Sequence, residues 1–244
     1  MRSLLAAFAF LTVVPVPVRL AERDFARAPF GFPLVGMVLG TLVALSDLGL
    51  DRLGLSPAFR GILAVGLLAA LSGGLHLDGL ADAADGFLSA RPRKRVLEIM
   101  RDPHIGTMGV LALVFVLAVK VAALVELPHP MRWKALVFAP LAGRCMLVSV
   151  MALLPYVRGS EGLATVFYGP HRRLAGLWAA VCVPAAAILL LHVVGGLLLA
   201  GSVFAITGVL SLWSWRRIGG LTGDTLGATS EIIEAAVLLF ASVV

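Results

Sequence analysis

Seven long apolar segments limit what this chain can fold into, because a helix needs about 20 mainly apolar residues to cross a bilayer core. Only 14% of the residues are charged and 60% are hydrophobic, with a mean hydropathy of +1.00. This balance excludes a soluble domain and a disordered chain, and it predicts an all-α, polytopic integral membrane helical bundle. The seven predicted spans are Phe30–Leu50, Gly61–Leu77, Gly106–Val125, Trp133–Leu154, Ala175–Leu191, Gly196–Trp215 and Glu231–Val244.

An eighth apolar segment, Ser3–Val18, is interrupted by Pro15 and Pro17. It can form an eighth span or a helix that lies only in the membrane interface, and the sequence does not decide between them. The chain contains no internal repeat and no soluble linker. The simplest organisation is a single membrane-embedded domain over residues 1–244.

The connecting segments must alternate between the two sides of the membrane, and their charges differ. Segments 19–29, 78–105, 156–173 and 216–229 share one side and hold 13 Lys and Arg residues, against 4 in the opposite segments. The positive-inside rule places the first set in the cytoplasm. This topology also accounts for the net charge of +6, and no spacing typical of nucleic-acid binding accompanies it, so nucleic acid is not expected as a partner. Most acids lie on the same side, and only Asp47, Asp51 and Glu126 belong to the other.

The densest group of candidate functional residues is an acidic segment at 73–86, with the sequence GGLHLDGLADAADG. Asp78, Asp82 and Asp85 have the spacing i, i+4, i+7, so on a helix they lie within about 60° of one another. Three like charges in one stripe repel, and a bound cation or protonation relieves the repulsion. Mg²⁺ takes carboxylate oxygens and often completes its shell with substrate phosphates, so the stripe predicts a Mg²⁺ site.

The alternative is that the stripe is solvated at the helix end or paired with arginines from other segments. Three acids at membrane depth are costly without a function, which favours the metal site. His76 would point about 160° away from Asp78 on a continuous helix. We therefore expect His76 in the core or beside the substrate rather than among the metal ligands.

A basic segment at 91–107 comes next and ends just before an apolar run. Arginines there could bind a polyanionic substrate such as a nucleotide, although topology and anionic lipid headgroups suffice to explain residues 91–94. Arg101 and Asp102 are stronger candidates for substrate binding. They precede a predicted helix whose first N–H groups would face the same pocket.

The third candidate segment, residues 222–234, places small and hydroxyl side chains around Asp224 ahead of a helix. Thr222, Gly223 and Asp224 would suit a phosphate or metal site. The alternative is ordinary helix-starting chemistry, since Asp, Ser and Glu all favour the first turn of a helix. The position of the segment on the side of the acidic stripe favours the functional interpretation.

Two cations lie inside predicted spans. Arg144 is near the middle of its span, where a cation costs at least about 2.5–3.5 kcal/mol, so it should pair with an acid or with a substrate phosphate inside the bundle. Lys120 lies towards the outer end of its span, and we expect its ammonium to snorkel to the interface.

Motifs along nearly the whole chain make it similar to the cobalamin synthase family, formally the adenosylcobinamide-GDP ribazoletransferases. The acidic segment is the longest of them. The others are FLT (10–12), PVP (15–17), FPLVG (32–36), EIMRD (98–102), IGT (105–107) and LTGDTLGA (221–228).

The resemblance implies a multi-pass inner-membrane enzyme with its active site in the cytoplasm. Such an enzyme joins adenosylcobinamide-GDP to α-ribazole, or to α-ribazole 5′-phosphate, and releases adenosylcobalamin, or its 5′-phosphate, together with GMP. It requires Mg²⁺. The expected partners are these small molecules and the lipid bilayer, with a second copy of the chain or other corrinoid-pathway enzymes as further candidates.

Our hypothesis gives each group of candidate residues a role in this reaction. The predicted metal ligands are Asp78, Asp82, Asp85 and Asp224. Asp82 and Asp85 are also the predicted catalytic pair, with Asp85 as ligand or as the base that takes the hydroxyl proton. The predicted substrate-binding residues are His76, Arg101, Asp102, Arg144, Arg158, Thr222 and Gly223, and the three arginines would neutralise the diphosphate.

Two alternatives remain open at this stage. A membrane phosphotransferase of the CDP-alcohol type also uses helical aspartates and Mg²⁺, but its characteristic run continues differently after Asp78-Gly79. An ion-coupled transporter could use the aspartates as a cation site. Transporters usually place that site near the midplane between repeated halves, and no such repeat occurs here.

Overall fold

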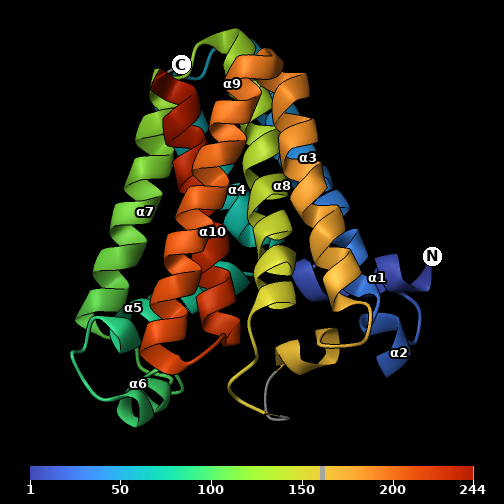
Figure 1. The fold of residues 1–244 in the computed structure, drawn as a ribbon. Helices are drawn as coiled ribbons and strands as arrows, with labels where there is room; N and C mark the ends of the chain where they lie inside the picture. The colour runs from blue at the N-terminus through green and yellow to red at the C-terminus, as the bar shows by residue number, and fades with distance from the viewer. Residues whose placement is uncertain (160–162, 244) are drawn as a thin grey trace.

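The computed structural model describes residues 1–159 and 163–243, and this part of the chain is helical with no strand. Five helices are long and apolar enough to cross a membrane, and a sharply bent pair can form a further span. The prediction of a polytopic helical membrane bundle is therefore confirmed (Figure 1). The helices are α1 Arg2–Leu11, α2 Glu22–Phe25, α3 Phe32–Arg52, α4 Pro57–Leu71, α5 Leu75–Phe87, α6 Arg93–Ile99, α7 Thr107–Glu126, α8 His129–Leu153, α9 Arg172–Ile218 and α10 Gly223–Val243, with 3₁₀ turns at Ala28–Gly31 and Leu163–Phe167.

Helix α9 is too long for one span, with 47 residues, and it breaks at His192, where φ is 62°. A Cβ atom on Gly196 would lie 2.5 Å from the backbone of Ile188. Eight residues of continuous helix would separate these positions by about 12 Å, so the second half folds back on the first. The two halves correspond to the predicted spans Ala175–Leu191 and Gly196–Trp215. With the bent pair counted as one span, the bundle has the seven spans expected.

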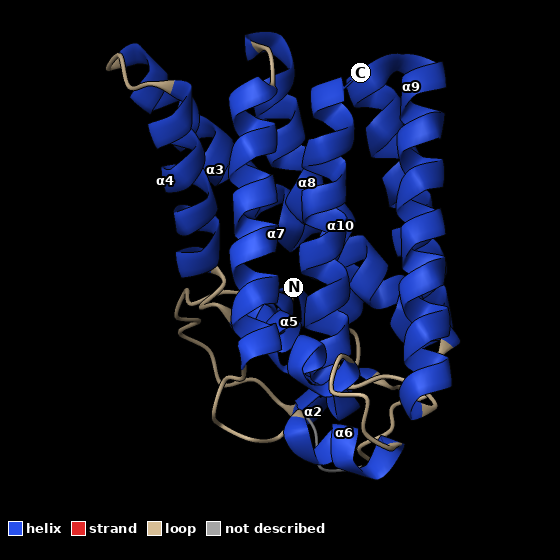
Figure 2. Cartoon of the chain, turned by 90° about the vertical axis from the view of Figure 1, so that its left-hand side faces the viewer, coloured by secondary structure: helices blue, strands red, loops and turns tan. Residues whose placement is uncertain are grey.

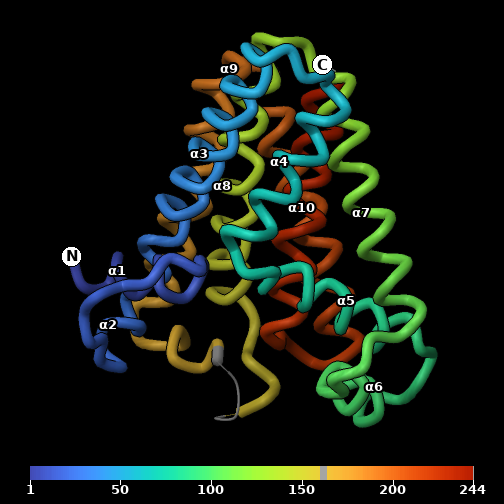
Figure 3. The backbone as a smooth tube through the Cα atoms, turned by 180° about the vertical axis from the view of Figure 1, so that it is seen from behind, coloured from blue at the N-terminus to red at the C-terminus, as the bar shows by residue number. Residues whose placement is uncertain are grey.

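The bent pair consists of α4 and α5, whose axes differ by 92°. The turn between them contains Gly73 and Gly74, both with left-handed backbone angles, at φ 63° and 70°. Few residues other than glycine adopt this conformation, and two in succession end a helix. The predicted span Gly61–Leu77 is therefore not one continuous helix. Its last three residues begin α5, which runs across the end of the bundle (Figure 3).

The bundle has two distinct ends, which we call lower and upper as they stand in Figure 1. The lower end holds α1, α2, α5, α6 and most of the loops, while short connections such as α3–α4 and α7–α8 lie at the upper end (Figure 2). This grouping matches the two sets of segments separated by charge in the sequence. Helix α1 has 10 residues and reaches about 15 Å, too short for a span, in accord with an interfacial segment.

Helix α8 lies at the centre of the bundle, packed against α3, α9 and α10, and most of its side chains are buried. Helix α10 packs on α5, α7 and α8. Its first turn therefore meets the acidic helix at the lower end, and this contact forms the candidate site. Val244, the last residue of the seventh predicted span, lies outside the described residues.

Candidate active site

The crossing of α5 and α10 depends on two glycines. A Cβ atom on Gly79 would come within 2.9 Å of the Asp224 carbonyl oxygen and 3.2 Å of the Gly227 Cα atom. A Cβ atom on Gly227 would meet the His76 carbonyl oxygen at 3.0 Å. The two backbones thus touch without intervening side chains, as in close helix pairs within membranes. This contact sets Asp224 beside the aspartates of α5.

Three of the predicted acids come together at this crossing. Asp78 and Asp224 line one cavity, and Asp82 lies close enough to both for their charges to interact. Arg158 is paired with this group, because its Nη2 lies 2.6 Å from Asp224 Oδ2, and it also donates to the Met100 carbonyl at 3.0 Å. The group thus contains three carboxyl side chains, and Arg158 is the cation seen paired with it.

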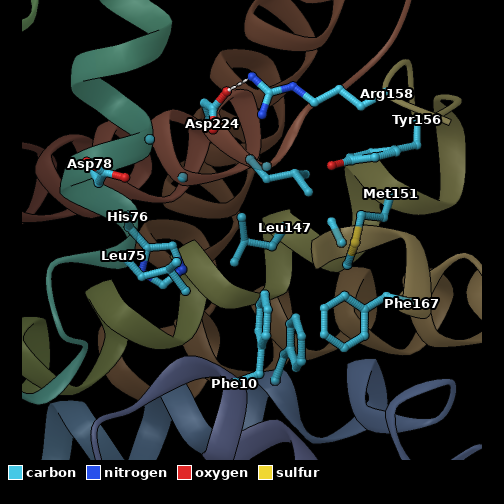
Figure 4. A pocket seen from close by; sticks show the side chains of 16 residues that line it. Phe10, Leu75, His76, Asp78, Leu147, Met151, Tyr156, Arg158, Phe167 and Asp224 are labelled. Atoms are coloured by element: carbon cyan, nitrogen blue, oxygen red, sulfur yellow. Dashed lines mark hydrogen bonds and ion pairs between the residues drawn. The ribbon is translucent and has the colours of Figure 1, made fainter. Parts of the chain in front are cut away.

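The cavity has a volume of about 270 Å³ and two different walls (Figure 4). Asp78, Asp224 and Arg158 lie on one side, and phenyl rings that include Phe10 and Phe167 lie on the other. Tyr156 also lines the cavity, and burial raises the pKa of its phenol. The phenol therefore stays protonated near neutral pH and can donate a hydrogen bond to a bound oxygen.

The apolar wall consists of packed aromatic side chains from α1, α3 and the loop before α9. The ring centroids of Phe10 and Phe167 are 4.6 Å apart, and those of Phe32 and Phe167 are 5.3 Å apart, both in edge-to-face arrangements. Leu147 and Met151 of α8 complete this side. An aromatic ligand would find both stacking surface and exclusion from water there.

Asp85 is on the same helix but has other partners. Its two carboxylate oxygens accept hydrogen bonds from the backbone N–H groups of Gly106, at 2.7 Å, and Gly109, at 2.8 Å. These N–H groups lie at the N-terminus of α7, where a negative charge is stabilising. Two of the N–H groups at this helix start, where the sequence suggested a substrate, are thus bonded to Asp85.

Thr222 and Gly223 stand at the start of α10. The Thr222 N–H donates to Thr225 Oγ1 at 2.9 Å, and the Thr225 N–H donates to Thr222 Oγ1 at 3.2 Å, which is helix-capping chemistry. The Thr222 hydroxyl also reaches Asp224 Oδ2 at 3.3 Å. Gly223 lines the cavity, with open space around its Cα atom.

The segment that carries Arg101 and Asp102 borders the site from outside. The charge of Arg101 acts on the Tyr156 phenol, which places this guanidinium near the cavity. Asp102 is exposed, and the backbone N–H and imidazole of His104 hold the pKa of its carboxyl below the ordinary value. Their predicted roles in substrate binding remain predictions.

Arg144 was predicted to pair with an acid or with a substrate phosphate. Its guanidinium forms an ion pair with an acid, Glu234 of α10. It lies behind the cavity wall, with Nη2 3.3 Å from His76 Nδ1, and His76 itself lines the cavity. The expectation that Lys120 snorkels is wrong. Lys120 is 3% exposed, and its Nζ lies 2.6 Å from carboxylate oxygens of both Glu231 and Glu234.

Comparison with known proteins decides the family. The family model for cobalamin-5-phosphate synthase matches residues 3–242. The chain belongs to this family. Two curated relatives, both called adenosylcobinamide-GDP ribazoletransferase, come from Desulforamulus reducens and Stutzerimonas stutzeri. The first is 38% identical over 97% of this chain and 94% of its own length, and the second 40% identical over 98% and 97%. No solved structure matches the chain significantly.

Family membership confirms the expected identity as a transferase of cobalamin synthesis, and the helices confirm a membrane protein. Several residues that line the cavity were not among the predicted site residues. Phe10 and Phe32 stood in motifs shared with the family, and no motif marked Tyr156 and Phe167. Within the described residues, no three His, Cys, Asp or Glu side chains form a ready-made metal cage.

Proposed function

We propose that this protein is an adenosylcobinamide-GDP ribazoletransferase. It joins adenosylcobinamide-GDP to α-ribazole, or to α-ribazole 5′-phosphate, and releases adenosylcobalamin, or its 5′-phosphate, and GMP, with Mg²⁺ as cofactor. The names of its relatives support this reaction. The observation that carries the proposal is the excess of carboxylates over cations at the cavity where α5 crosses α10.

The residues of the site fit Mg²⁺, although they form no closed cage. Mg²⁺ is usually held by one or two carboxylates together with substrate phosphates, so an incomplete protein shell is what a diphosphate substrate requires. Asp78, Asp82 and Asp224 supply oxygen ligands and the compensating negative charge. When bound with the diphosphate, the ion would neutralise the negative charge that builds up on the phosphate oxygens.

The chain's own groups position the reacting atoms. A hydroxyl of the ribazole attacks the phosphorus next to cobinamide, a new P–O bond forms, the bond between the two phosphates breaks, and GMP leaves. Arg158 and Arg101 neutralise the diphosphate, and the Tyr156 phenol and the His76 imidazole can donate hydrogen bonds to it. The hydroxyl proton passes to a carboxylate of α5, for which Asp82 is the cavity-side candidate.

The aromatic wall gives the acceptor a place to bind. The flat base of α-ribazole would stack among Phe10, Phe32 and Phe167, and its ribose would then face the carboxylates across the cavity. A cavity of about 270 Å³ is too small for the corrin ring, which would therefore stay outside the cavity, at the lower end of the bundle. The cavity is thus proposed to hold the ribazole and the diphosphate.

The lower end faces the cytoplasm in this proposal, and the protein spans the inner membrane. The excess of Lys and Arg in the lower segments supports this orientation. Both substrates would then enter from the cytoplasm at the α5 end of the bundle. Lipids surround the apolar outer faces of α7 and α9, where large side chains such as Phe115 and Leu189 are exposed.

The test is release of GMP by the purified protein with adenosylcobinamide-GDP and α-ribazole, measured with Mg²⁺ and with excess EDTA. We expect turnover with Mg²⁺, a loss of at least about a thousandfold with EDTA, and recovery when Mg²⁺ is restored. Turnover of CDP-diacylglycerol in place of the corrinoid, or passage of substrate across proteoliposomes without GMP release, would reject the proposal.

A further inference from the structure

A second ionic group lies inside the bundle, above the cavity. It contains Lys120 from α7, Arg144 from α8 and Glu231 and Glu234 from α10, and we call it the inner cluster. Lys120 Nζ lies 2.6 Å from Glu231 Oε2 and 2.6 Å from Glu234 Oε2, and Arg144 pairs with Glu234 from the other side. Each of the four residues is at most 5% exposed.

The inner cluster is electrically neutral, with two cations and two carboxylates. Such a group gains little stability over apolar residues of similar size, because the desolvation of each charge offsets most of the attraction. Apolar side chains at these positions would serve packing equally well. Polar groups buried at membrane depth therefore point to a function beyond packing.

The inner cluster reaches the cavity through one side chain. Arg144 Nη2 lies 3.3 Å from His76 Nδ1, and His76 lines the cavity beside Asp78 and Gly79. A guanidinium has donors and no acceptor, so Nδ1 must accept, and the hydrogen of the imidazole sits on Nε2. Arg144 thereby determines which nitrogen of His76 can donate to a bound substrate.

We propose that Arg144 and Glu234 are positioning residues of the transferase site, which hold the His76 imidazole in the cavity wall as a donor to the substrate through Nε2. Glu234 orients the guanidinium of Arg144, and Lys120 and Glu231 hold Glu234. This inference rests on the proposed function for the identity of the substrate. The contact between Arg144 and His76 does not depend on that identity.

The upper end of the bundle supplies a matched control. Asp47, Asp51, Arg60, His129 and Arg132 form ion pairs there, and we call them the upper cluster. Arg132 Nη2 lies 2.7 Å from Asp47 Oδ1, and these two side chains are as buried as those of the inner cluster, at 2% and 3% exposure. The Asp47–Arg132 pair has the same chemistry and burial, but no residue of the upper cluster lines the cavity within the described part of the chain.

The test is a double-mutant cycle on GMP release with Glu234→Gln and His76→Leu. Glu234→Gln should lower kcat about tenfold with little change in KM for the corrinoid, and it should have no further effect once His76 is leucine. His76→Gln, which keeps a side-chain N–H, should recover part of the kcat lost in His76→Leu. Asp47→Asn at the upper end is the control. Its effect on kcat and that of His76→Leu should be independent, so the double variant should show the product of the two. Independent, multiplying effects of Glu234→Gln and His76→Leu would overturn the proposal.

A spectroscopic measurement separates this inference from the proposed reaction. In ¹⁵N-histidine-labelled protein, the His76 signals, assigned by their loss in His76→Gln, should show the tautomer with hydrogen on Nε2. Arg144→Met should change that tautomer balance, and Arg132→Met should leave it unchanged. If Glu234→Gln does not fold, Arg144→Met takes its place in the cycle with His76→Leu and should likewise have no further effect on kcat once His76 is leucine. An Nδ1–H tautomer in the unaltered protein would overturn the proposal even if GMP release is normal.

Discussion

Acidic side chains gather at both ends of the bundle, but the two groups differ in how far neighbouring cations balance their charge. In the upper cluster, Arg132 donates to both oxygens of Asp47, and Asp51 is 2.7 Å from Arg60 and 2.9 Å from His129. At the lower end, the carboxylates of Asp78, Asp82 and Asp224 share one arginine. We call these three the lower carboxylates.

The difference teaches where function resides in a chain with few charges. An acid whose charge is balanced within the protein helps hold helices together, and here it ties the ends of α3, α4 and α8. A group with excess negative charge is unstable by itself and becomes favourable when a cation is bound. Removing one lower carboxylate should therefore cost turnover, whereas removing one upper carboxylate should cost stability.

The largest loss of turnover is expected for Asp82→Asn. The change keeps the shape of the side chain, removes one negative charge beside Asp78 and Asp224, and should lower kcat by about 10²–10³-fold. Because the repulsion among the lower carboxylates is reduced, the unfolding temperature in detergent should stay the same or rise. Near-normal GMP release by this variant would remove the lower carboxylates from the mechanism.

The crossing of α5 and α10 gives the next effect. Gly79→Ala adds a Cβ atom 2.9 Å from the Asp224 carbonyl, so one backbone must move and Asp224 shifts relative to Asp78. A displacement of about 1 Å in a catalytic site can cost about 10²-fold, and we expect a loss of kcat of up to that size. Gly66→Ala on α4 is the matched control, since a Cβ atom there meets nothing within 4 Å. Equal turnover in the two variants would contradict the role of the close crossing.

Asp85 is an intermediate case, because it belongs to the acidic stripe but has satisfied oxygens like the upper acids. Asp85→Asn should lower the stability of the α7 N-terminus by about 1–2 kcal/mol and reduce kcat by no more than about tenfold. GMP release and thermal unfolding of the same preparation distinguish the two effects. If kcat falls as far as in Asp82→Asn with unchanged unfolding, the sequence-based role of Asp85 as metal ligand or base holds instead.

The sequence predicted the helices and one side of the site, because both depend on local spacing. Apolar runs of membrane length gave the spans, and the i, i+4, i+7 spacing placed three aspartates on one helix, which α5 confirms. The break before α5 was missed because Gly73 and Gly74 hardly change the hydropathy of the segment. Two adjacent glycines were the available signal.

Contacts between segments far apart in the chain could not be predicted from the sequence. Lys120 was expected at the interface because nothing in its own helix offers a partner, yet Glu231 lies 111 residues further on and Glu234 114. Asp85 bonds to N–H groups of α7 that the sequence analysis expected to face a substrate, and the aromatic wall joins three separate segments. Burial and pairing of this kind follow from how the helices pack, which spacing along one helix does not determine.

Turnover should respond least to Asp47→Asn, although the stability of the protein should fall most. Arg132 is 2% exposed and would lose its charged partner, and an uncompensated buried charge costs about 3–5 kcal/mol. The folded fraction should keep kcat within about twofold, since the upper cluster lies at the opposite end of the bundle from the cavity. Replacing both partners, with Asp47→Leu and Arg132→Met, should recover part of the lost stability because the pair then leaves no lone charge behind. If folded Asp47→Asn protein lost as much kcat as Asp82→Asn, the upper acids would not be purely stabilising, and the proposed difference in role between the two ends would be wrong.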